Sequence, residues 1–227
     1  MNGILFIASV VVSLLCLTGI YRLLGKSGLY AWVAFACVFA NIEVLKTVQC
    51  FGLETTLGNA LFGTVFLATQ ILSEKYGEAD AKKAIKTGFA IELVFILLSQ
   101  IDIMFVPSET DFAHESFLTL FTLAPRVCAG SMLAFAFGNI TDIYIFNRLK
   151  QIHKGKYLWL RNNASTLVSQ FFDNIVFHTI AFLGPMDFNH VMILSVNVWL
   201  LEAVVALLDT PFMYLAKKIN FSEATLS

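Results

Sequence analysis

Four polar side chains interrupt an apolar stretch, residues 124–150, that is long enough to cross a lipid bilayer. They are Arg126, Ser131, Asn139 and Asp142. A helix turns by about 100° per residue, so Ser131, Asn139 and Asp142 fall within an arc of roughly 80°. An unpaired charge at bilayer depth costs at least about 2.5 kcal/mol on insertion scales, so this arc must face protein or water. We therefore expect it to line a polar functional site.

A second apolar stretch, residues 163–184, is richer still in polar groups. Ser165, Ser169 and Asp173 stack at i, i+4 and i+8 of a helix, and a neighbouring column holds Thr166, Gln170, Asn174 and His178. Hydrogen bonds between transmembrane helices explain two or three such groups. Seven of them on one side, with a carboxylate near the middle, indicate a polar cavity.

Other apolar stretches add further acidic and amide groups, and Glu43 and Lys46 are spaced to pair on one helix. We predict that substrate is bound by Asn41, Gln70, Arg126, Ser131, Asn139, Asp142, Ser169, Gln170, Asp173 and Asn174. Coupling or gating is predicted for Glu43, Glu74 and Glu202, and Glu43 and Asp173 are the candidates for carrying a proton.

The composition places these residues in an integral membrane protein. Hydrophobic residues make up 58% of the chain and charged residues 14%, with a mean hydropathy of +0.76. Soluble domains average about 45–50% apolar residues. Strand-like alternation does not recur, so the predicted fold class is all-α, in a single transmembrane transporter domain over residues 1–227. The net charge of −1 gives no sign of nucleic-acid binding.

A spanning helix needs about 20 mostly apolar residues. The sequence predicts seven, with six as the alternative count, at residues 4–24, 29–50, 55–73, 86–106, 122–147, 163–184 and 190–215. Thirteen of the fifteen Lys and Arg residues fall on alternate connections, which are the cytoplasmic ones by the positive-inside rule. We therefore expect a multi-pass protein of the bacterial inner membrane, with its N-terminus outside and its C-terminus in the cytoplasm.

Enzyme chemistry has little support in the sequence. It lacks HExxH, a Walker loop and GxGxxG, and its four cysteines are scattered singly, so we expect no metal and no cofactor. The one hydrolase reading would use Ser131 as nucleophile and His178 as base. Transport is the favoured function, and a substrate-binding subunit that needs a separate ATPase is the alternative. The expected partners are a small purine-like base and the bilayer, and a homodimer is allowed.

Three runs of this chain resemble the queuosine precursor transporter family, also called vitamin uptake transporters. They are VFLATQILSEKYG, PRVCAGSMLAFAFGNITDIYIFNRLK and NNASTLVSQFFDNIVFHTIAF, and the resemblance covers about residues 41 to 215. Its most specific part is the spacing of Arg126, Ser131, Asn139, Asp142, Phe146, Asn147 and Arg148, followed by Ala164, Ser165, Thr166 and Asp173. The resemblance implies uptake of 7-deazaguanine precursors of the tRNA nucleoside queuosine, such as preQ0, preQ1 or queuine.

The side chains suit such a substrate on independent grounds. A deazaguanine is a flat base that presents N–H donors and a carbonyl acceptor along one edge, and a carboxylate beside an amide satisfies both. Asp142 with Asn139 is one such pair, and Asp173 with Gln170 or Asn174 is another. Ring stacking is expected from an aromatic residue, with the candidates Phe135, Phe137, Phe171, Phe172 and Trp199.

Overall fold

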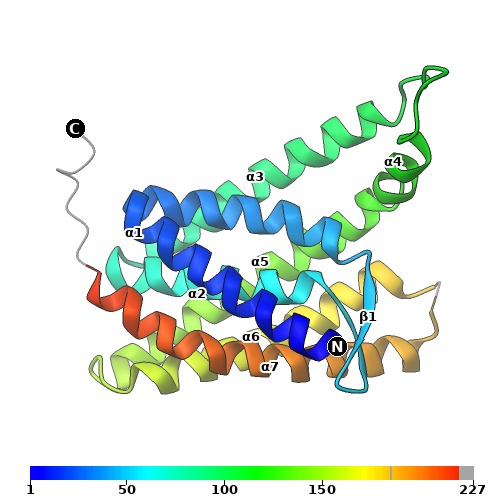
Figure 1. The fold of residues 1–227 in the computed structure, drawn as a ribbon. Helices are drawn as coiled ribbons and strands as arrows, with labels where there is room; N and C mark the ends of the chain where they lie inside the picture. The colour runs from blue at the N-terminus through cyan, green and yellow to red at the C-terminus, as the bar shows by residue number, and fades with distance from the viewer. Residues whose placement is uncertain (185, 220–227) are drawn as a thin grey trace.

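The computed structural model describes residues 1–184 and 186–219 and shows a bundle of long helices (Figure 1). The elements in chain order are α1 (Asn2–Glu43), β1 (Thr47–Cys50), β2 (Leu53–Thr56), α2 (Gly58–Lys75), α3 (Glu78–Asp102), α4 (His114–Phe121), α5 (Ala124–Ile152), α6 (Leu158–Phe182) and α7 (Phe188–Lys218). The predicted helical class therefore describes most of the chain, with one short β-hairpin as the exception.

Helix α1 is folded back on itself at Gly25, so that it forms two arms that run side by side (Figure 1). Gly25 has φ 57° and ψ −136°, a backbone conformation that side-chain-bearing residues rarely adopt. The arms, residues 2–24 and 26–43, correspond to the first two predicted helices.

The prediction that the second helix continues to residue 50 is wrong. The helix ends at Glu43, and Thr47–Cys50 pairs antiparallel with Leu53–Thr56 as a hairpin. Phe51 and Gly52 form its turn with φ of 54° and 83°, the left-handed conformations that a tight hairpin needs. The β-branched residues of both strands favour this pairing over a helix.

Helices α3, α5, α6 and α7 are longer than predicted. The charged segment at residues 78–86 is the first part of α3 rather than a loop, because Gly77 (φ 100°) ends the preceding turn and Glu78 and Asp80 suit a helix N-terminus. Helix α5 extends to Ile152, and α6 starts at Leu158. The connection between α3 and α5 contains the short helix α4, which begins at His114.

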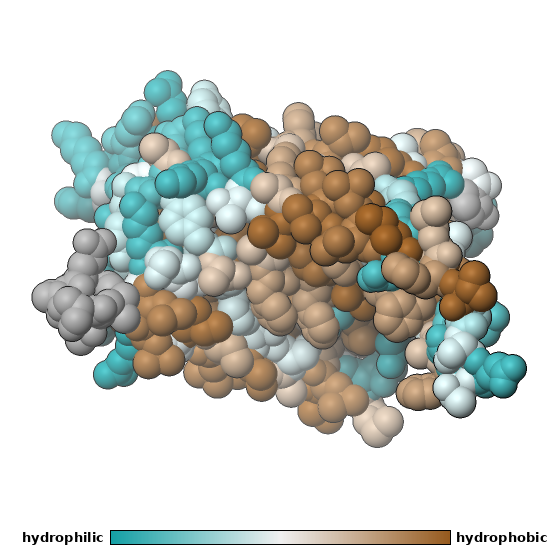
Figure 2. Space-filling model, turned by 90° about the horizontal axis from the view of Figure 1, so that it is seen from above, coloured by the Kyte–Doolittle hydropathy of each residue, from teal (hydrophilic) through white to brown (hydrophobic). Residues whose placement is uncertain are grey.

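The most apolar helices surround the most polar ones. Within the described residues, four helical segments are long and apolar enough to cross a membrane: Asn2–Glu43, Glu78–Asp102, His114–Ile152 and Phe188–Lys218. Helix α2 is buried along almost its whole length and packs against α1, α3, α5 and α7, while α6 lies between α5 and α7. Figure 2 shows a face on which apolar side chains fill the middle and hydrophilic ones gather toward the ends. This distribution is that of a protein embedded in a bilayer.

The basic connections come together at one end of the bundle, away from the N-terminus (Figure 1). There, Lys26 beside the Gly25 fold forms an ion pair of 2.7 Å with Asp80 at the start of α3. The β-hairpin lies at the opposite end, and so does the start of α7, where Asp187 caps the helix by accepting a hydrogen bond from the His190 backbone. The His190 ring also hydrogen-bonds Asp187 and lowers the pKa of its carboxyl.

Substituting Gly25 by alanine should destabilise the fold, because the added Cβ strains this backbone conformation by about 1–3 kcal/mol. The control is Gly19→Ala on the same arm, where a Cβ meets no atom within 4 Å and helix propensity improves by up to about 1 kcal/mol. Thermal unfolding in detergent is the measurement. A Gly25→Ala protein as stable as the Gly19→Ala protein would contradict the proposed role of the fold at Gly25.

Candidate substrate-binding site

A fully buried carboxylate, Asp142 on α5, ties three helices together in the core. Gln70 on α2 places its Nε2 atom 2.9 and 3.0 Å from the two Asp142 oxygens. The same amide nitrogen lies 2.6 Å from Thr166 Oγ1 and 3.2 Å from Ser165 Oγ on α6. Four acceptors share two N–H groups, so the amide can exchange among them. We call Gln70, Asp142, Ser165, Thr166 and Ser169 the Asp142 cluster.

The α6 hydroxyls contribute further hydrogen bonds within this cluster. Ser169 and Thr166 each lie 3.4 Å from Asp142 Oδ1, and Ser169 also donates to the Ser165 carbonyl at 2.7 Å. Asn139, fully buried and one turn before Asp142, accepts a hydrogen bond of 3.3 Å from Thr69. Asp142 is thus surrounded by neutral hydrogen-bonding groups in this conformation.

A small cavity, lined by polar and apolar side chains together, lies beside the second predicted carboxylate, Asp173. Five helices supply its lining, which consists of Ala40, Asn41, Val44, Gly58, Asn59, Phe62, Ser131, Ala134, Asp173, Asn174, Phe177 and Glu202. Its volume is about 30 Å³, enough for a water molecule or two but not for a base. We call it the central cavity.

Polar atoms around the central cavity have hydrogen-bonding capacity to spare. Asp173 Oδ1, in the cavity wall, is buried and has no hydrogen-bond partner among the described residues. One turn earlier on α6, both side-chain amide atoms of Gln170, which does not line the cavity, are also buried without a partner. Asn174 donates to the Gln170 carbonyl at 2.8 Å and also to Glu202 on α7. Buried groups of this kind are costly unless a polar partner satisfies them, so they are suited to bind a polar ligand.

Close helix packing holds Asp173 against α5. A Cβ atom added to Gly138 would lie 2.7 Å from Asp173 Oδ1 and 2.9 Å from its Cβ. Only glycine leaves room for the carboxylate at this crossing. Gly138 on α5 therefore helps to position the Asp173 side chain of α6.

The comparison with known proteins identifies the family. A family described as putative vitamin uptake transporter matches residues 56–216. The chain belongs to this family. It is 41% identical over 200 residues to a probable queuosine precursor transporter of Bacillus subtilis (strain 168), covering 88% of this chain and 87% of that protein.

Two more distant relatives have the same description. A queuosine precursor transporter of Escherichia coli (strain K12) is 32% identical over 150 residues, which is 65% of this chain and 64% of the relative. A probable queuosine precursor transporter of Haemophilus influenzae (strain ATCC 51907 / DSM 11121 / KW20 / Rd) is 30% identical over 149 residues, with shares of 65% and 60%. No solved structure matches the chain.

The family confirms the predicted resemblance, and the protein is a membrane transporter rather than an enzyme. Among the described residues, the two residues of the hydrolase interpretation, Ser131 and His178, are not hydrogen-bonded to each other. His178 Nδ1 lies 3.1 Å from Ser195 Oγ on α7, whereas Ser131 lines the central cavity.

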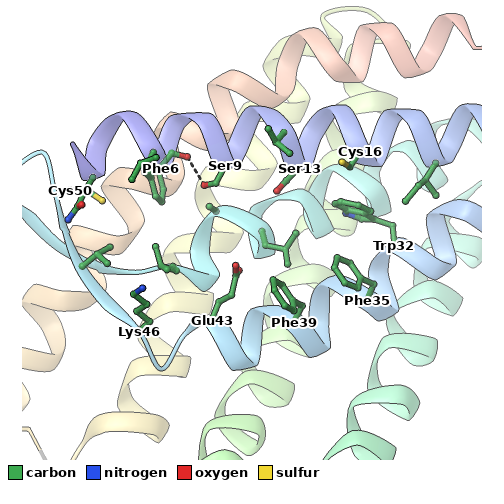
Figure 3. Close-up of a pocket in the computed structure, with 18 of the residues that line it drawn as sticks. Phe6, Ser9, Ser13, Cys16, Trp32, Phe35, Phe39, Glu43, Lys46 and Cys50 are labelled. Carbon is green, nitrogen blue, oxygen red and sulfur yellow. Dashed lines mark hydrogen bonds between the residues drawn. The ribbon is translucent and has the colours of Figure 1, made fainter. Parts of the chain in front are cut away.

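A larger hollow in the transporter runs between the two arms of α1 and has a volume of about 1030 Å³. Figure 3 shows side chains from both arms, such as Phe6 and Phe39, pointing into this groove. Its lining is mostly apolar, and most of it precedes the segment that matches the family. A polar base needs hydrogen-bonding partners, so we regard the central cavity, and not the groove, as the candidate site.

Five of the thirteen predicted site residues line the central cavity: Asn41, Ser131, Asp173, Asn174 and Glu202. Five more lie on the helices around it, with Gln70, Asp142 and Ser169 in the Asp142 cluster, Asn139 one turn before Asp142 and Gln170 one turn before Asp173. Glu74 lies at the basic end of the bundle, and Arg126 and Glu43 have other partners.

Arg126 donates to the carbonyls of Ile180 (3.0 Å) and Leu183 (2.6 Å), which terminate α6. Glu43 lines the groove on α1. The described side chains of Glu43 and Lys46 do not form the expected ion pair, because the helix ends at Glu43 and Lys46 lies beyond it. The backbone of Lys46 instead donates to the Glu43 carbonyl.

The stacking candidates also lie away from the cavity. Phe135 is buried against Phe62 and Phe89, and Phe171 packs on Trp199. Phe137 and Phe172 contact each other and are about half exposed. The aromatic side chains that do line the central cavity are Phe62 and Phe177. Phenylalanine is too frequent in this sequence for spacing alone to single them out.

Glu74 binds three cations at the basic end of the transporter. Its carboxylate lies 2.9 Å from Lys150 on α5, 2.9 Å from Arg161 on α6 and 3.0 Å from Lys217 on α7. The Arg161 side chain is completely buried and lies over the Phe146 ring. We call these four charged residues the Glu74 network, and it joins α2 to the other half of the bundle.

Glu74→Gln should destabilise the transporter by about 3 kcal/mol or more, because it leaves the buried Arg161 cation without its carboxylate. The matched control is Glu78→Gln, which breaks an ion pair with Lys82 whose side chains are 45% and 51% exposed. Such an exposed pair contributes less than about 1 kcal/mol. Thermal unfolding of both variants in detergent tests this, and equal shifts would contradict the role assigned to the network.

Proposed function

We propose that this transporter imports queuosine precursors, 7-deazaguanine bases such as preQ0, preQ1 or queuine, across the bacterial inner membrane. The base is bound near mid-membrane at the central cavity and moved by alternating access. One observation carries the proposal: one turn apart on α6, a carboxylate oxygen of Asp173 and the side-chain amide of Gln170 are buried without a partner among the described residues, in a transporter whose relatives are named for these substrates.

The groups around the central cavity complement the edge of a deazaguanine. Asp173 can accept hydrogen bonds from the ring N–H and exocyclic amine, while the Gln170 amide can donate to the carbonyl. Phe62 and Phe177 offer rings for stacking, a contact that contributes about 1–3 kcal/mol in other base-binding proteins. Asn174 on α6 and Glu202 on α7, which are hydrogen-bonded to each other, also line the cavity and offer further polar contacts to a bound base.

The small volume of the central cavity supports a mechanism in which the helices around it move apart. A cavity of about 30 Å³ cannot hold a base, so α6 and its neighbours must separate to admit one. The Glu74 network holds one end shut, and its cations would mark the cytoplasmic side by the positive-inside rule. In this arrangement α1 crosses twice, and seven crossings place the N-terminus outside and the C-terminus in the cytoplasm.

Reconstitution of the purified chain in liposomes tests the function. Vesicles loaded with unlabelled preQ1 should take up labelled preQ1 by counterflow, and preQ0 or queuine should compete better than unrelated vitamins. Binding without counterflow would instead favour the alternative, a substrate-binding subunit that needs a separate ATPase. Absence of both would contradict the proposal.

Asp173→Asn and Asp142→Asn should each reduce counterflow at least about tenfold, because the first removes the carboxylate proposed to bind the base and the second removes the carboxylate on which the Gln70 amide and the α6 hydroxyls converge. Asp102→Asn, at the exposed end of α3, is the control and should transport normally. Membrane insertion is checked by quantifying protein in the vesicles. Full transport by both core variants would refute the proposed site. Loss of transport in Ser131→Ala alone would show that Ser131, and not either carboxylate, is the essential group.

Gly138→Ala should impair counterflow about tenfold, because the added methyl group would displace the Asp173 carboxylate. Gly130→Ala lies on the same helix, but its Cβ would come no nearer than 3.4 Å to Ile180 and the Phe177 carbonyl, and it should retain transport. Comparing initial rates of the two proteins at equal vesicle content tests the packing argument. It fails if the two variants transport equally.

A further inference from the structure

Glu92, near the middle of α3, is a buried carboxyl that the proposed binding site does not use. Its residue is 1% exposed, and its Oε1 atom accepts a hydrogen bond of 2.7 Å from Asn41 on the second arm of α1. Ser131 on α5 lies beside it. The carboxyl is thus enclosed by three helices, in a part of α3 that otherwise presents apolar side chains to the surroundings.

No cation in the described part of the chain lies within 4.0 Å of Glu92. The titratable groups that face it are the thiols of Cys37 on α1 and Cys128 on α5. Helix α2 carries its charges, Glu74 and Lys75, at the distant basic end. An ionised Glu92 would therefore be a buried charge that nothing neutralises, and a proton removes that charge.

The two polar neighbours of Glu92 form part of the wall of the central cavity. Asn41 and Ser131 both line that cavity, while Glu92 lies behind them. The Asn41 amide is divided between Glu92 and the Cys37 carbonyl, 3.0 Å away. A carboxylate can only accept hydrogen bonds, whereas a carboxylic acid also donates one. Loss or gain of a proton at Glu92 must therefore rearrange hydrogen bonds at the cavity wall.

We propose that Glu92 carries the proton of a proton-coupled import cycle and that the substrate cavity senses its protonation through Asn41 and Ser131. The inference rests on the proposed function. In the closed state Glu92 holds the proton as a neutral acid. When the cavity opens to one side and admits water, Glu92 can exchange its proton with the water on that side. If it takes up a proton where the base enters and releases that proton where the base leaves, one proton crosses with each base.

This assignment replaces the candidates that the sequence offered for carrying the proton. Glu43 is half-buried in the groove on α1, away from the cavity wall. Asp173 lines the cavity and is needed for the base itself. Glu92 differs from both, since it is sealed from the surroundings yet touches residues that contact the cavity.

The test uses proteoliposomes with the membrane potential clamped at zero and labelled preQ0, an uncharged base. With the outside more acidic by one pH unit, wild-type vesicles should accumulate preQ0 about tenfold, since one proton then balances that concentration ratio. Glu92→Gln preserves an oxygen that can accept from Asn41, so it should retain counterflow. It should lose accumulation, with equal concentrations inside and outside. Asp102→Asn, exposed on the same helix, should accumulate normally.

The outcomes separate this inference from the proposed function. Absence of counterflow in the wild type refutes both. Counterflow that ignores the pH gradient refutes the inference alone, and so does accumulation by Glu92→Gln at the wild-type level. If Glu92→Gln does not fold, wild-type vesicles can be treated with dicyclohexylcarbodiimide, which modifies protonated carboxyls in apolar surroundings. Peptide mapping should find the adduct on Glu92 and less of it at alkaline pH, and a pH-independent or absent adduct overturns the proposal.

Discussion

The structure depends on one constraint: polar side chains at bilayer depth must be kept from lipid and satisfied within the protein. Helices α2 and α6 carry the densest sets of such groups, and the more apolar α1, α3, α5 and α7 pack around them. Asp142 shows how this constraint is met. Its carboxylate has no cation within ion-pair distance among the described residues, yet amide and hydroxyl donors from α2 and α6 surround it. Hydrogen bonding, rather than charge pairing, holds this core together.

The two halves of the polar core differ in what they leave for a ligand. The Asp142 cluster is internally satisfied, so it links helices and resists opening. Around Asp173, by contrast, acceptors and donors remain unpartnered beside a small cavity. A transporter needs both properties, since it must be stable when empty and able to exchange internal hydrogen bonds for those of its substrate. The Glu74 network links the helices at one end of the bundle through ion pairs, and water can solvate these charges when the ion pairs separate.

Much of this organisation was predictable from the sequence because helical periodicity fixes which residues share a face. The polar columns of α5 and α6 and the break near Gly25 all follow from spacing. Partnerships between distant segments do not. Nothing local indicates that Gln70 would meet Asp142, or that Arg126 would bind the end of α6. The β-hairpin was missed because its two short strands were joined to the apolar runs on either side, although their β-branched residues favour strands.

The central claim is that the base binds beside Asp173 in the core. The most direct test is an experimental structure of the transporter with preQ1 bound. The account predicts that the base lies between α5, α6 and α7, with its edge within hydrogen-bond distance of Asp173 and Gln170 and with the central cavity enlarged around it. A base bound instead in the groove between the arms of α1, with Asp173 still unpartnered, would contradict the account.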